Sequence, residues 1–485
     1  MTAAYVMDAP TDLQEVYLRS NLPVTEECDG LLPIVEGALP EDLRGTLFRN
    51  GPGRLEVYGQ RYHHPFDGDG HLHRFGFTDR GLVHRNRYVR TREFLEEEAA
   101  RKILYRSFGT NIPGGLAHNF LRMRFKNAAN TSVLWHGGRL YALWEGGWPH
   151  RIDPLTLDTL ARDDLGGMLR PESLSDRIFT PELPFSAHPR LDPTTGELFN
   201  FGVAAGRQPS LVLYRQSPGG ACLQRERMPL AATGFIHDFG LTSRYRVFFF
   251  TPSTFDVPRT LLGFAPPAET LRANPDATAI LLLPRRGTQA RTLQAPPCFV
   301  YHFANAYDDG DRVVIDAARM DEVPAADVAP RMLAGQPVDY PAPYLTRYTL
   351  DVRTGRVDEQ RLTDHPGELP TINPARSSLA HRYVWSIARP PDRKQPYSTG
   401  LIKVDTHGPT STFRDFGQNL TGEPIFVPRP RASAEDDGWI LSMCYDSLNH
   451  TGELLILDAA DLRTVARARM PHHTPLGFHG TWVPA

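Results

Sequence analysis

Short apolar runs separated by turn residues dominate the chain from about residue 130 onward. Residues 139–147 and 150–157 are typical, because they predict a strand, a turn, a second strand and then an Asp-Pro turn. Similar patterns recur at 196–202, 211–215, 245–250, 312–319, 345–351, 383–388, 400–405, 439–445 and 453–458. Units of about 40–60 residues would repeat about seven times, which predicts an all-β, seven-bladed β-propeller.

Two segments depart from this pattern and predict a cap of loops and short helices over the top face. Residues 91–123 mix apolar and charged side chains around a Gly-rich bend, and residues 253–275 form a long apolar insertion. We expect the early strands near 45–50 and 57–78 to close the ring with the last blade. No linker divides the chain, so residues 1–485 are predicted to form a single domain.

Composition narrows the classes of function. The net charge of −3 gives no electrostatic case for nucleic acid. The four cysteines are scattered, which argues against a disulfide framework or a cysteine-based zinc site and fits a reducing cytosol. No basic region followed by an apolar run begins the chain, and no stretch approaches about 18 apolar residues. We therefore expect a cytoplasmic protein without a spanning helix or an obligate protein partner.

Four histidines, His188, His237, His302 and His479, each lie beside strand-like sequence. The gaps between them are 49, 65 and 177 residues, too far apart for one helix or loop to collect them. A closed, radially repeating sheet can collect them, because its inner strands all point at one axis. Imidazole suits iron, copper, nickel and zinc, so these four residues are candidate metal ligands. The other clustered histidines, at 63–73 and 472–473, are expected to be polar strand and loop positions.

Further motifs accompany these histidines in a fixed order. They are Gly-Thr-Leu-Phe-Arg-Asn-Gly-Pro-Gly (45–53), His-Pro-Phe-Asp-Gly-Asp-Gly (64–70), Phe-Lys-Asn-Ala-Ala-Asn-Thr (125–131), Ala-Leu-Trp-Glu-Gly-Gly (142–147), Gly-Glu-Leu-Pro-Thr-Ile-Asn (367–373), Gly-Glu-Pro-Ile-Phe-Val-Pro (422–428) and Glu-Asp-Asp-Gly-Trp (435–439). Together with the histidine motifs, they make the chain resemble the carotenoid cleavage oxygenase family nearly end to end, and its bacterial apocarotenoid oxygenases most.

The resemblance implies a non-haem Fe(II) dioxygenase that cleaves a conjugated double bond of an apocarotenoid with O2, giving two carbonyl products. It implies four histidine ligands to Fe(2+), supported by three glutamates that orient them. By motif, Glu145 pairs with His237, Glu368 with His302 and Glu423 with His479, while His188 lacks a carboxylate partner. Thr131 is expected beside an open coordination position, where its methyl group restricts access of ligands.

A polyene substrate requires an apolar tunnel, and the resemblance assigns its lining to Phe66, Phe108, Trp144, Phe235 and Tyr301. Delivery of such a substrate predicts peripheral contact with a membrane. We assign that contact to apolar residues of the 253–275 insertion, helped by two residues of the 103–123 segment. The insertion contributes Phe255, Val257, Leu261, Leu262 and Phe264, and the second segment contributes Ile103 and Leu104.

Three alternatives share or imitate this fold. A lignostilbene-type dioxygenase would hold a phenolic stilbene with a tyrosine and a lysine. No lysine lies between Asn127 and His188, which speaks against this alternative, although an arginine could substitute. A retinoid-ester isomerase is disfavoured by the likeness to bacterial members. A non-catalytic propeller that only binds a partner would have no need of the complete histidine and glutamate sets.

Overall fold

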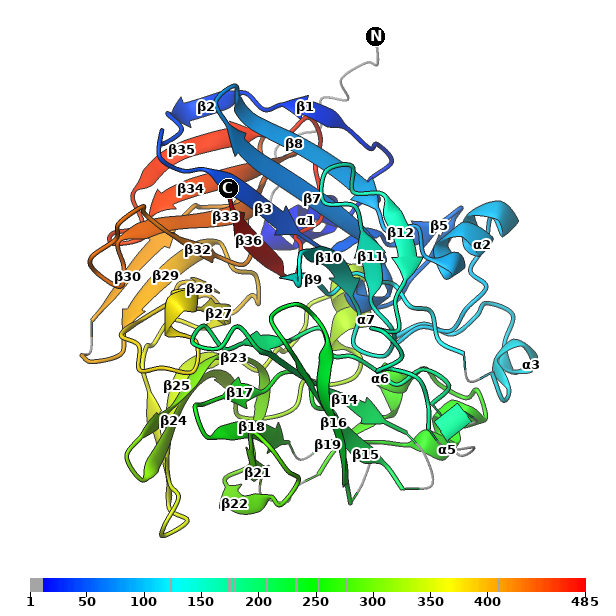
Figure 1. The fold of residues 1–485 in the computed structure, drawn as a ribbon. Coiled ribbons are helices and arrows are strands. Elements are labelled where there is room, and N and C mark those ends of the chain that lie inside the picture. The colour runs from blue at the N-terminus through cyan, green and yellow to red at the C-terminus, as the bar shows by residue number, and fades with distance from the viewer. Residues whose placement is uncertain are drawn as a thin grey trace.

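A closed ring of antiparallel sheets forms the body of the protein in this computed structural model (Figure 1). The structure describes residues 12–122, 124–172, 176–177, 180–205, 208–231, 234–251, 253–274, 278–408 and 410–485. Within these residues, five four-stranded and two six-stranded sheets are the blades of a seven-bladed β-propeller. The predicted fold class is therefore confirmed.

The five four-stranded blades follow one another along the chain, and in each the chain enters at an edge strand and continues by antiparallel pairing. Blade two holds β9 (Ser132–His136), β10 (Arg139–Leu143), β11 (His150–Ile152) and β12 (Thr159–Arg162). Blade three holds β13 (Arg190–Leu191), β14 (Leu198–Ala204), β15 (Ser210–Gln216) and β16 (Cys222–Pro229), and blade four holds β17 (Gly240–Leu241), β18 (Tyr245–Phe250), β21 (Thr278–Pro284) and β22 (Arg291–Ala295). Blade five holds β23 (Phe299–Asp309), β24 (Arg312–Met320), β25 (Tyr344–Asp351) and β26 (Val357–Arg361), and blade six holds β27 (Gly367–Thr371), β28 (Tyr383–Ala388), β29 (Gly400–Asp405) and β30 (Ser411–Asp415).

The two six-stranded blades close the ring by exchanging strands from the two ends of the chain. Blade one holds β1 (Asp29–Leu31), β8 (Gly81–Tyr88), β7 (Asp69–Thr78), β3 (Gly45–Arg49), β36 (Gly480–Pro484) and β4 (Pro52–Arg54). Blade seven holds β2 (Ile34–Gly37), β35 (Thr464–Arg469), β34 (Thr451–Asp458), β33 (Gly438–Asp446), β31 (Leu420–Thr421) and β32 (Ile425–Pro428).

This closure differs from the sequence expectation. β3 and β7 belong to the first blade and accept β36 from the C-terminus, whereas β2 is the strand that joins the last blade. Pairing between the two ends of a chain depends on where the ring closes, which local patterns do not encode. Because both ends are built into partner sheets, β3 and β35 are not left as unpaired edges.

Hydrophobic clusters lie between neighbouring blades. Leu47 and Phe75 of blade one pack with Leu441 and Ile456 of blade seven. The blade-four residues Val247 and Ile280 likewise lie in one cluster with residues of blade five. Burial of each such side chain contributes about 1.5–3 kcal/mol, so the sheet faces carry the stability and the inner strand ends are free for polar residues.

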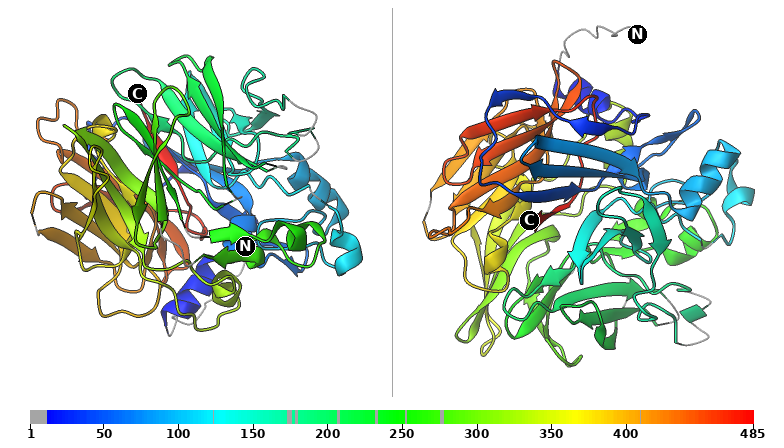
Figure 2. Two further views of the ribbon diagram at one scale, coloured as in Figure 1. Left: turned by 90° about the horizontal axis from the view of Figure 1, so that it is seen from below. Right: turned by 45° about the horizontal axis from the view of Figure 1, so that its top comes forward.

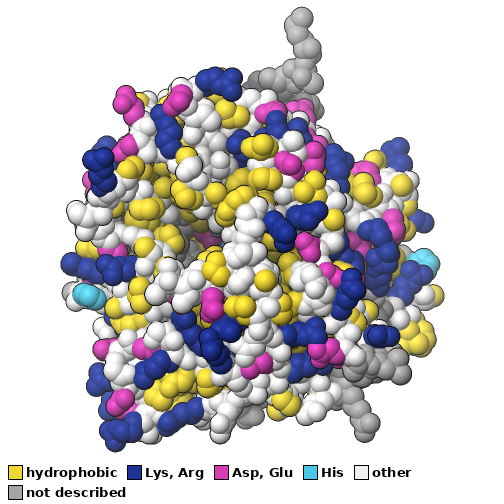
Figure 3. Space-filling model, viewed as in Figure 1, with side chains coloured by type: hydrophobic (Ala, Val, Ile, Leu, Met, Phe, Trp, Pro, Cys, Tyr) yellow, Lys and Arg dark blue, Asp and Glu magenta, His cyan; other side chains and the backbone are white. Residues whose placement is uncertain are grey.

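Short helices and hairpins lie outside the blades, and several cover one side of the ring, as the two views in Figure 2 show. These elements are α1 (Leu13–Ser20), η1 (Pro65–Asp67), α2 (Arg92–Ala100), α3 (Leu116–Asn119), α5 (Val257–Leu261), α6 (Pro267–Thr270), α7 (Val328–Leu333), η2 (Pro374–Arg376) and the hairpins β5 (Glu56–Val57) with β6 (Gln60–Arg61) and β19 (Ser253–Phe255) with β20 (Leu271–Ala273). On the face drawn in Figure 3, basic and acidic side chains are interspersed rather than gathered by sign.

Candidate metal centre and substrate cavity

Four histidines from four blades meet at the axis of the ring. His188 and His237 precede β13 and β17, His302 lies in β23, and His479 directly precedes β36. One ligand atom from each lies within 4.8 Å of the others. The positions follow from the topology, because β17, β23 and β27 contact one another in turn and β36 contacts β9 and β32. We call His188, His237, His302 and His479 the axial cluster.

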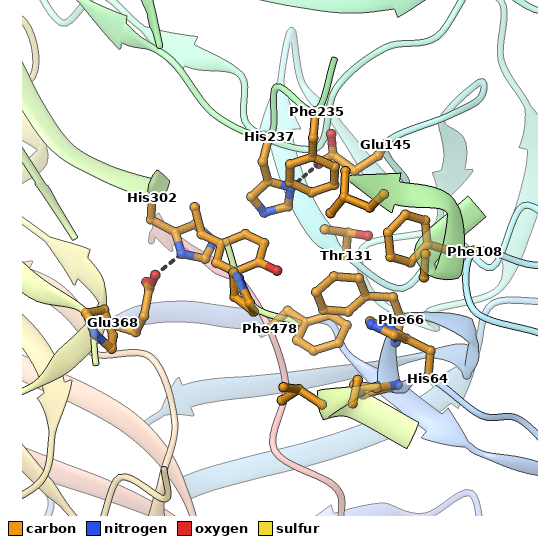
Figure 4. Close-up of a pocket in the computed structure, with 18 of the residues that line it drawn as sticks. His64, Phe66, Phe108, Thr131, Glu145, Phe235, His237, His302, Glu368 and Phe478 are labelled. Atoms are coloured by element: carbon orange, nitrogen blue, oxygen red, sulfur yellow. Dashed lines mark hydrogen bonds and ion pairs between the residues drawn. The ribbon is translucent and has the colours of Figure 1, made fainter. Parts of the chain in front are cut away.

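Two glutamates orient two of these rings. Glu368, in β27, accepts a hydrogen bond from Nδ1 of His302 at 2.7 Å (Figure 4). Glu423, between β31 and β32, accepts one from Nδ1 of His479 at 2.7 Å. Glu423 also accepts from the backbone N–H of Gly480 at 2.9 Å and forms an ion pair with the buried Arg49. A carboxylate on Nδ1 leaves Nε2 as the free lone pair, which is the tautomer a metal ligand requires.

Glu145 follows β10 and relates differently to its histidine. Its Oε1 lies 3.6 Å from Nδ1 of His237, longer than the two hydrogen bonds of the other glutamates. The same oxygen lies 3.7 Å from Nε2 of His188 and accepts a hydrogen bond from the backbone N–H of Ala187 at 3.2 Å. Glu145 thus lies close to both His188 and His237, instead of orienting His237 alone.

Burial and the neighbouring carboxylates set the charge of the site. Burial, together with the three other imidazoles, lowers the pKa of His188 well below its ordinary value. Burial alone would lower the pKa of His302, but Glu368 outweighs it and raises that pKa. Burial raises the pKa of Glu145 to about 8, whereas His479 and Arg49 overcome the effect of burial and hold the pKa of Glu423 below its usual range.

The donor set fits a divalent transition metal. Nε2 of His302 is buried and has no hydrogen-bond partner among the described residues, which is costly unless a ligand satisfies it. Nε2 of His188 lies only 2.9 Å from Nε2 of His237, so two further nitrogens are turned toward the same centre. Four imidazole nitrogens around one point suit iron, copper, nickel or zinc.

A cavity of about 590 Å³ opens beside the axial cluster, within the range of small-molecule sites. His237, His302 and His479 contribute to its wall, as do Glu145, Glu368 and Thr131. The hydroxyl of Thr131 donates to Oδ1 of Asn130 at 3.1 Å. All five aromatic residues that the resemblance assigned to a tunnel lie in this wall: Phe66, Phe108, Trp144, Phe235 and Tyr301.

Several lining residues escaped the sequence analysis. Phe478, which precedes His479 in the chain just as Tyr301 precedes His302, contacts Phe66 with ring centroids 5.5 Å apart. An aromatic residue next to a ligand-type histidine was thus a usable signal. His64 also lines the cavity and packs edge-on against Phe66 and Phe108. Phe125 begins the 125–131 motif and Phe255 belongs to the apolar insertion, but neither was assigned to the cavity wall. Tyr17, Tyr340 and Arg389 reach the wall from separate segments that no local pattern marks.

Comparisons with known proteins agree with this geometry. The model of the family described as "Retinal pigment epithelial membrane protein" matches residues 21–484. The chain is 35% identical to apocarotenoid-15,15'-oxygenase from Synechocystis over 96% of both chains, and 28% identical to lignostilbene-alpha,beta-dioxygenase isozyme III from Sphingomonas paucimobilis over 96% of both.

The crystal structure of cobalt-substituted Synechocystis apocarotenoid oxygenase superimposes with a TM-score of 0.90 at 34% identity, covering 97% of this chain and 99% of that one. Fold, motif order and axial cluster therefore lead to one conclusion. The chain belongs to the carotenoid cleavage oxygenase family, and it is an oxygenase of that family.

Proposed function

We propose that this protein is a non-haem Fe(II) dioxygenase that cleaves one conjugated double bond of an apocarotenoid. The observation that carries the proposal is the axial cluster at the wall of an aromatic cavity. The cluster provides four imidazole nitrogens that would hold a metal, and the cavity provides a largely aromatic volume for a polyene. The likeness to an apocarotenoid oxygenase over nearly the whole chain supports the same substrate class.

His188, His237, His302 and His479 would hold the iron, with Glu145, Glu368 and Glu423 fixing ring orientation. Bound there, Fe(II) would supply coordination positions at which dioxygen is activated beside the alkene. The proposed cleavage needs no external reductant, because the O–O bond and the C=C bond both break and one oxygen atom goes to each carbon. Two C=O groups result.

The residues of this chain position the reactants. The aromatic wall holds the polyene and excludes water, so that one double bond stays near the metal. Thr131 lines the cavity with its hydroxyl already bonded to Asn130. We assign to its methyl group the narrowing of one coordination position, which would favour dioxygen over bulkier ligands.

The test is product identification with iron-loaded protein and a panel of apocarotenals and stilbenes. We expect two carbonyl fragments from the apocarotenals and one O2 consumed for each double bond cleaved. Cleavage of stilbenes alone would overturn the proposal in favour of the lignostilbene-type alternative. The 28% identity to a lignostilbene dioxygenase is the reason for including stilbenes in the panel. Tight polyene binding without O2 uptake would instead indicate a non-catalytic binding protein.

We also propose that an exposed apolar surface brings the cavity to a membrane. None of the described helices is long and apolar enough to cross a bilayer. Val257, Leu262 and Phe264 are exposed, and beside them lie the exposed Leu116, Phe120 and Leu121. The two segments touch, since the backbone N–H of Leu121 donates to Leu261 at 3.0 Å.

This surface differs in part from the one expected. Ile103 is only 2% exposed and packs with Val57 and Tyr62 in the interior, so it cannot contact lipid. Phe255 lines the cavity, and Leu261 is half-buried. The insertion that carries part of the exposed set also reaches the cavity, because Phe255 and Ala268 line it and the backbone N–H of Ala268 donates to Phe108, another lining residue, at 2.8 Å.

Liposome co-sedimentation tests the membrane proposal. Each Leu or Phe inserted into the interface is worth about 1.5–3 kcal/mol, so two or three allow weak, reversible attachment. The Leu262→Asp/Phe264→Asp double variant should lose most binding. A matched control, Leu155→Asp/Leu160→Asp, changes exposed leucines of the blade-two region and should bind like the unmodified protein. Equal binding by both variants would overturn the assignment.

A further inference from the structure

Arg389 is a buried cation in the wall of the cavity without a carboxylate partner. It is 6% exposed, and its Nε donates to the backbone carbonyl of Arg393 at 3.1 Å. Among the described residues, no acidic group pairs with it and no acceptor bonds its two terminal nitrogens. Two other buried arginines have partners for their terminal nitrogens: Arg49 pairs with Glu423, and Arg106 donates to the backbone carbonyls of Arg122 and Ala265. An unpaired buried charge raises the free energy of the folded protein. A buried arginine without a partner therefore points to a site where a bound ligand supplies the partner.

The backbone places Arg389 next to the metal-supporting side of the cavity. Arg389 directly follows β28, and its N–H donates to Pro366 at 3.0 Å. Glu368 pairs with Ile387 across β27 and β28. Side chains two residues apart on a strand share a face, so Arg389 projects to the same side as Ile387 and Glu368. Figure 4 shows Glu368 and His302 on one side of the cavity and Phe66, Phe108 and His64 on the other.

Tyr340 adds a second polar group at this place. It lines the cavity, and within the described part of the chain its hydroxyl has no hydrogen-bond partner. Burial, followed by neighbouring phenol and carboxylate groups, raises the pKa of Tyr340 well above its ordinary value, while Arg389 opposes that shift. The hydroxyl therefore remains a neutral donor beside the guanidinium. The surrounding wall is apolar, with Pro343, Pro366 and Pro396.

We propose that Arg389 and Tyr340 bind the oxygen-bearing end group of the substrate, and that the preferred substrates are polyenes ending in a carboxylate. This inference rests on the proposed function of the cavity. A guanidinium presents parallel N–H donors that match a carboxylate, and the exclusion of water strengthens that pair. An aldehyde oxygen accepts fewer and weaker hydrogen bonds. A hydrocarbon end group would leave the cation without any partner.

Anchoring one end of the polyene also selects the bond that is cleaved. With the carboxylate held at Arg389, the double bond beside the axial cluster is set by the span between these two places in the cavity. Loss of the anchor would let the chain slide along the aromatic wall. The distribution of product lengths is therefore a readout that a merely structural role of Arg389 would not change.

The experiment compares Arg389→Met with the unmodified enzyme on three polyenes of matched length that end in a carboxylate, an aldehyde or a methyl group. We expect kcat/KM for the acid to fall by about 10–100-fold, the range of a hydrogen bond to a charged group, mainly through KM. Cleavage of the hydrocarbon should be unchanged or faster, and the acid should give fragments from more than one double bond. Arg389→Lys, which keeps the charge but not the fork, should be intermediate.

A matched control is Arg382→Met. Arg382 pairs with Asp405 of β29 at 2.7 Å and is absent from the residues that line the cavity within the described chain. This variant should show the unmodified preference among the three end groups. Equal loss on acid and hydrocarbon in Arg389→Met, with unchanged product lengths, would overturn the proposal. The same shift of preference in Arg382→Met would overturn it too.

Anaerobic binding separates this inference from the proposed function. Quenching of protein fluorescence gives a Kd for the acid and for the methyl-ended polyene without any cleavage. If no polyene is cleaved but the acid binds at least about 10-fold more tightly and Arg389→Met removes that difference, the proposed function fails while the anchor stands. Equal Kd values for the two ligands would overturn the anchor, whatever the activity.

Discussion

The axial cluster and a second group of histidines around blade one are both largely buried, yet their ring nitrogens are used differently. We call His71, His73, His84 and His472 the blade-one cluster. Its rings bond mainly to one another and to neutral groups: Nδ1 of His73 lies 3.1 Å from Nε2 of His84, and Nε2 of His73 lies 3.2 Å from the Thr474 hydroxyl. In the axial cluster, carboxylates occupy Nδ1 of His302 and His479 instead.

The rest of the blade-one cluster follows the same pattern. Cys28 Sγ lies between His84 and His472, at 3.8 and 3.5 Å from their ring nitrogens. His71 stacks on Tyr88 and has no hydrogen-bond partner on either nitrogen among the described residues. Burial lowers the pKa of both His71 and His84 to about 3. The rings of His71 and His84 are therefore neutral packing elements of the sheet.

Number and burial of histidines therefore do not define a metal centre. Within the described residues, only the axial cluster brings three or more ligand atoms within 4.8 Å of one another. What distinguishes it is the carboxylate behind the ring, which fixes the tautomer and turns the free nitrogen inward. The comparison can be tested by changing ligand, carboxylate and packing histidine in turn.

The largest effect is expected from the ligand itself. His302→Ala should abolish both iron retention and polyene cleavage, because it removes a nitrogen that has no other partner. His84→Ala changes a buried histidine of the other cluster and should keep about one iron per chain, and His407→Ala is an exposed control. Metal analysis measures iron retention, and O2 uptake measures polyene cleavage, in each of these variants. Stoichiometric zinc in the unmodified protein, with no response to added iron, would contradict the iron assignment.

Glu423→Gln should combine a loss of iron affinity with a loss of stability. Glu423 supports His479 and also pairs with Arg49, whose side chain is 1% exposed. Removing the negative charge of Glu423 leaves the buried positive charge of Arg49 without an ion-pair partner. We expect this loss to lower the free energy of unfolding by about 3 kcal/mol. Chemical denaturation and metal titration check the two effects. Full stability with reduced iron affinity would show that Arg49 finds another acceptor.

Glu368→Gln isolates the orienting role. No cation pairs with Glu368 among the described residues, so the fold should stay intact while iron affinity or activity falls by about 10–100-fold. Comparing it with Glu423→Gln separates ring orientation from ion pairing. A variant indistinguishable from the unmodified protein would show that the 2.7 Å contact with His302 is dispensable.

The blades and the four axial histidines could be predicted from the sequence, because strand patterns are local and each histidine lies in its own short motif. Val247 and Phe249, for example, lie two residues apart in β18 and pack in one cluster, while Phe248 between them packs in another. The strand exchange of β2 and β36 was not predictable, since it depends on ring closure. Arg389 and Tyr340 were missed for a related reason: each is an ordinary polar residue in sequence, and only the packing of blade six against the cap places both in one cavity.

The smallest effect is expected from His71→Phe, which tests the packing role of the blade-one cluster. The ordinary histidine pKa of 6.5 applies to the unfolded chain, while burial holds that of folded His71 at about 3. Between these two pH values the unfolded chain binds a proton that the folded protein does not, so stability falls as the pH falls through this window.

Phenylalanine has no such proton, and it leaves no new unsatisfied donor because neither nitrogen of His71 has a partner in the described chain. The variant should therefore lose stability less steeply on acidification, by up to about 1 kcal/mol per pH unit. Denaturant unfolding at pH 7, 5.5 and 4.5 measures the slope, and iron content at pH 7 should equal that of the unmodified protein. An unchanged slope, or a loss of iron, would show that His71 is not a neutral packing element and would weaken the distinction between the two clusters.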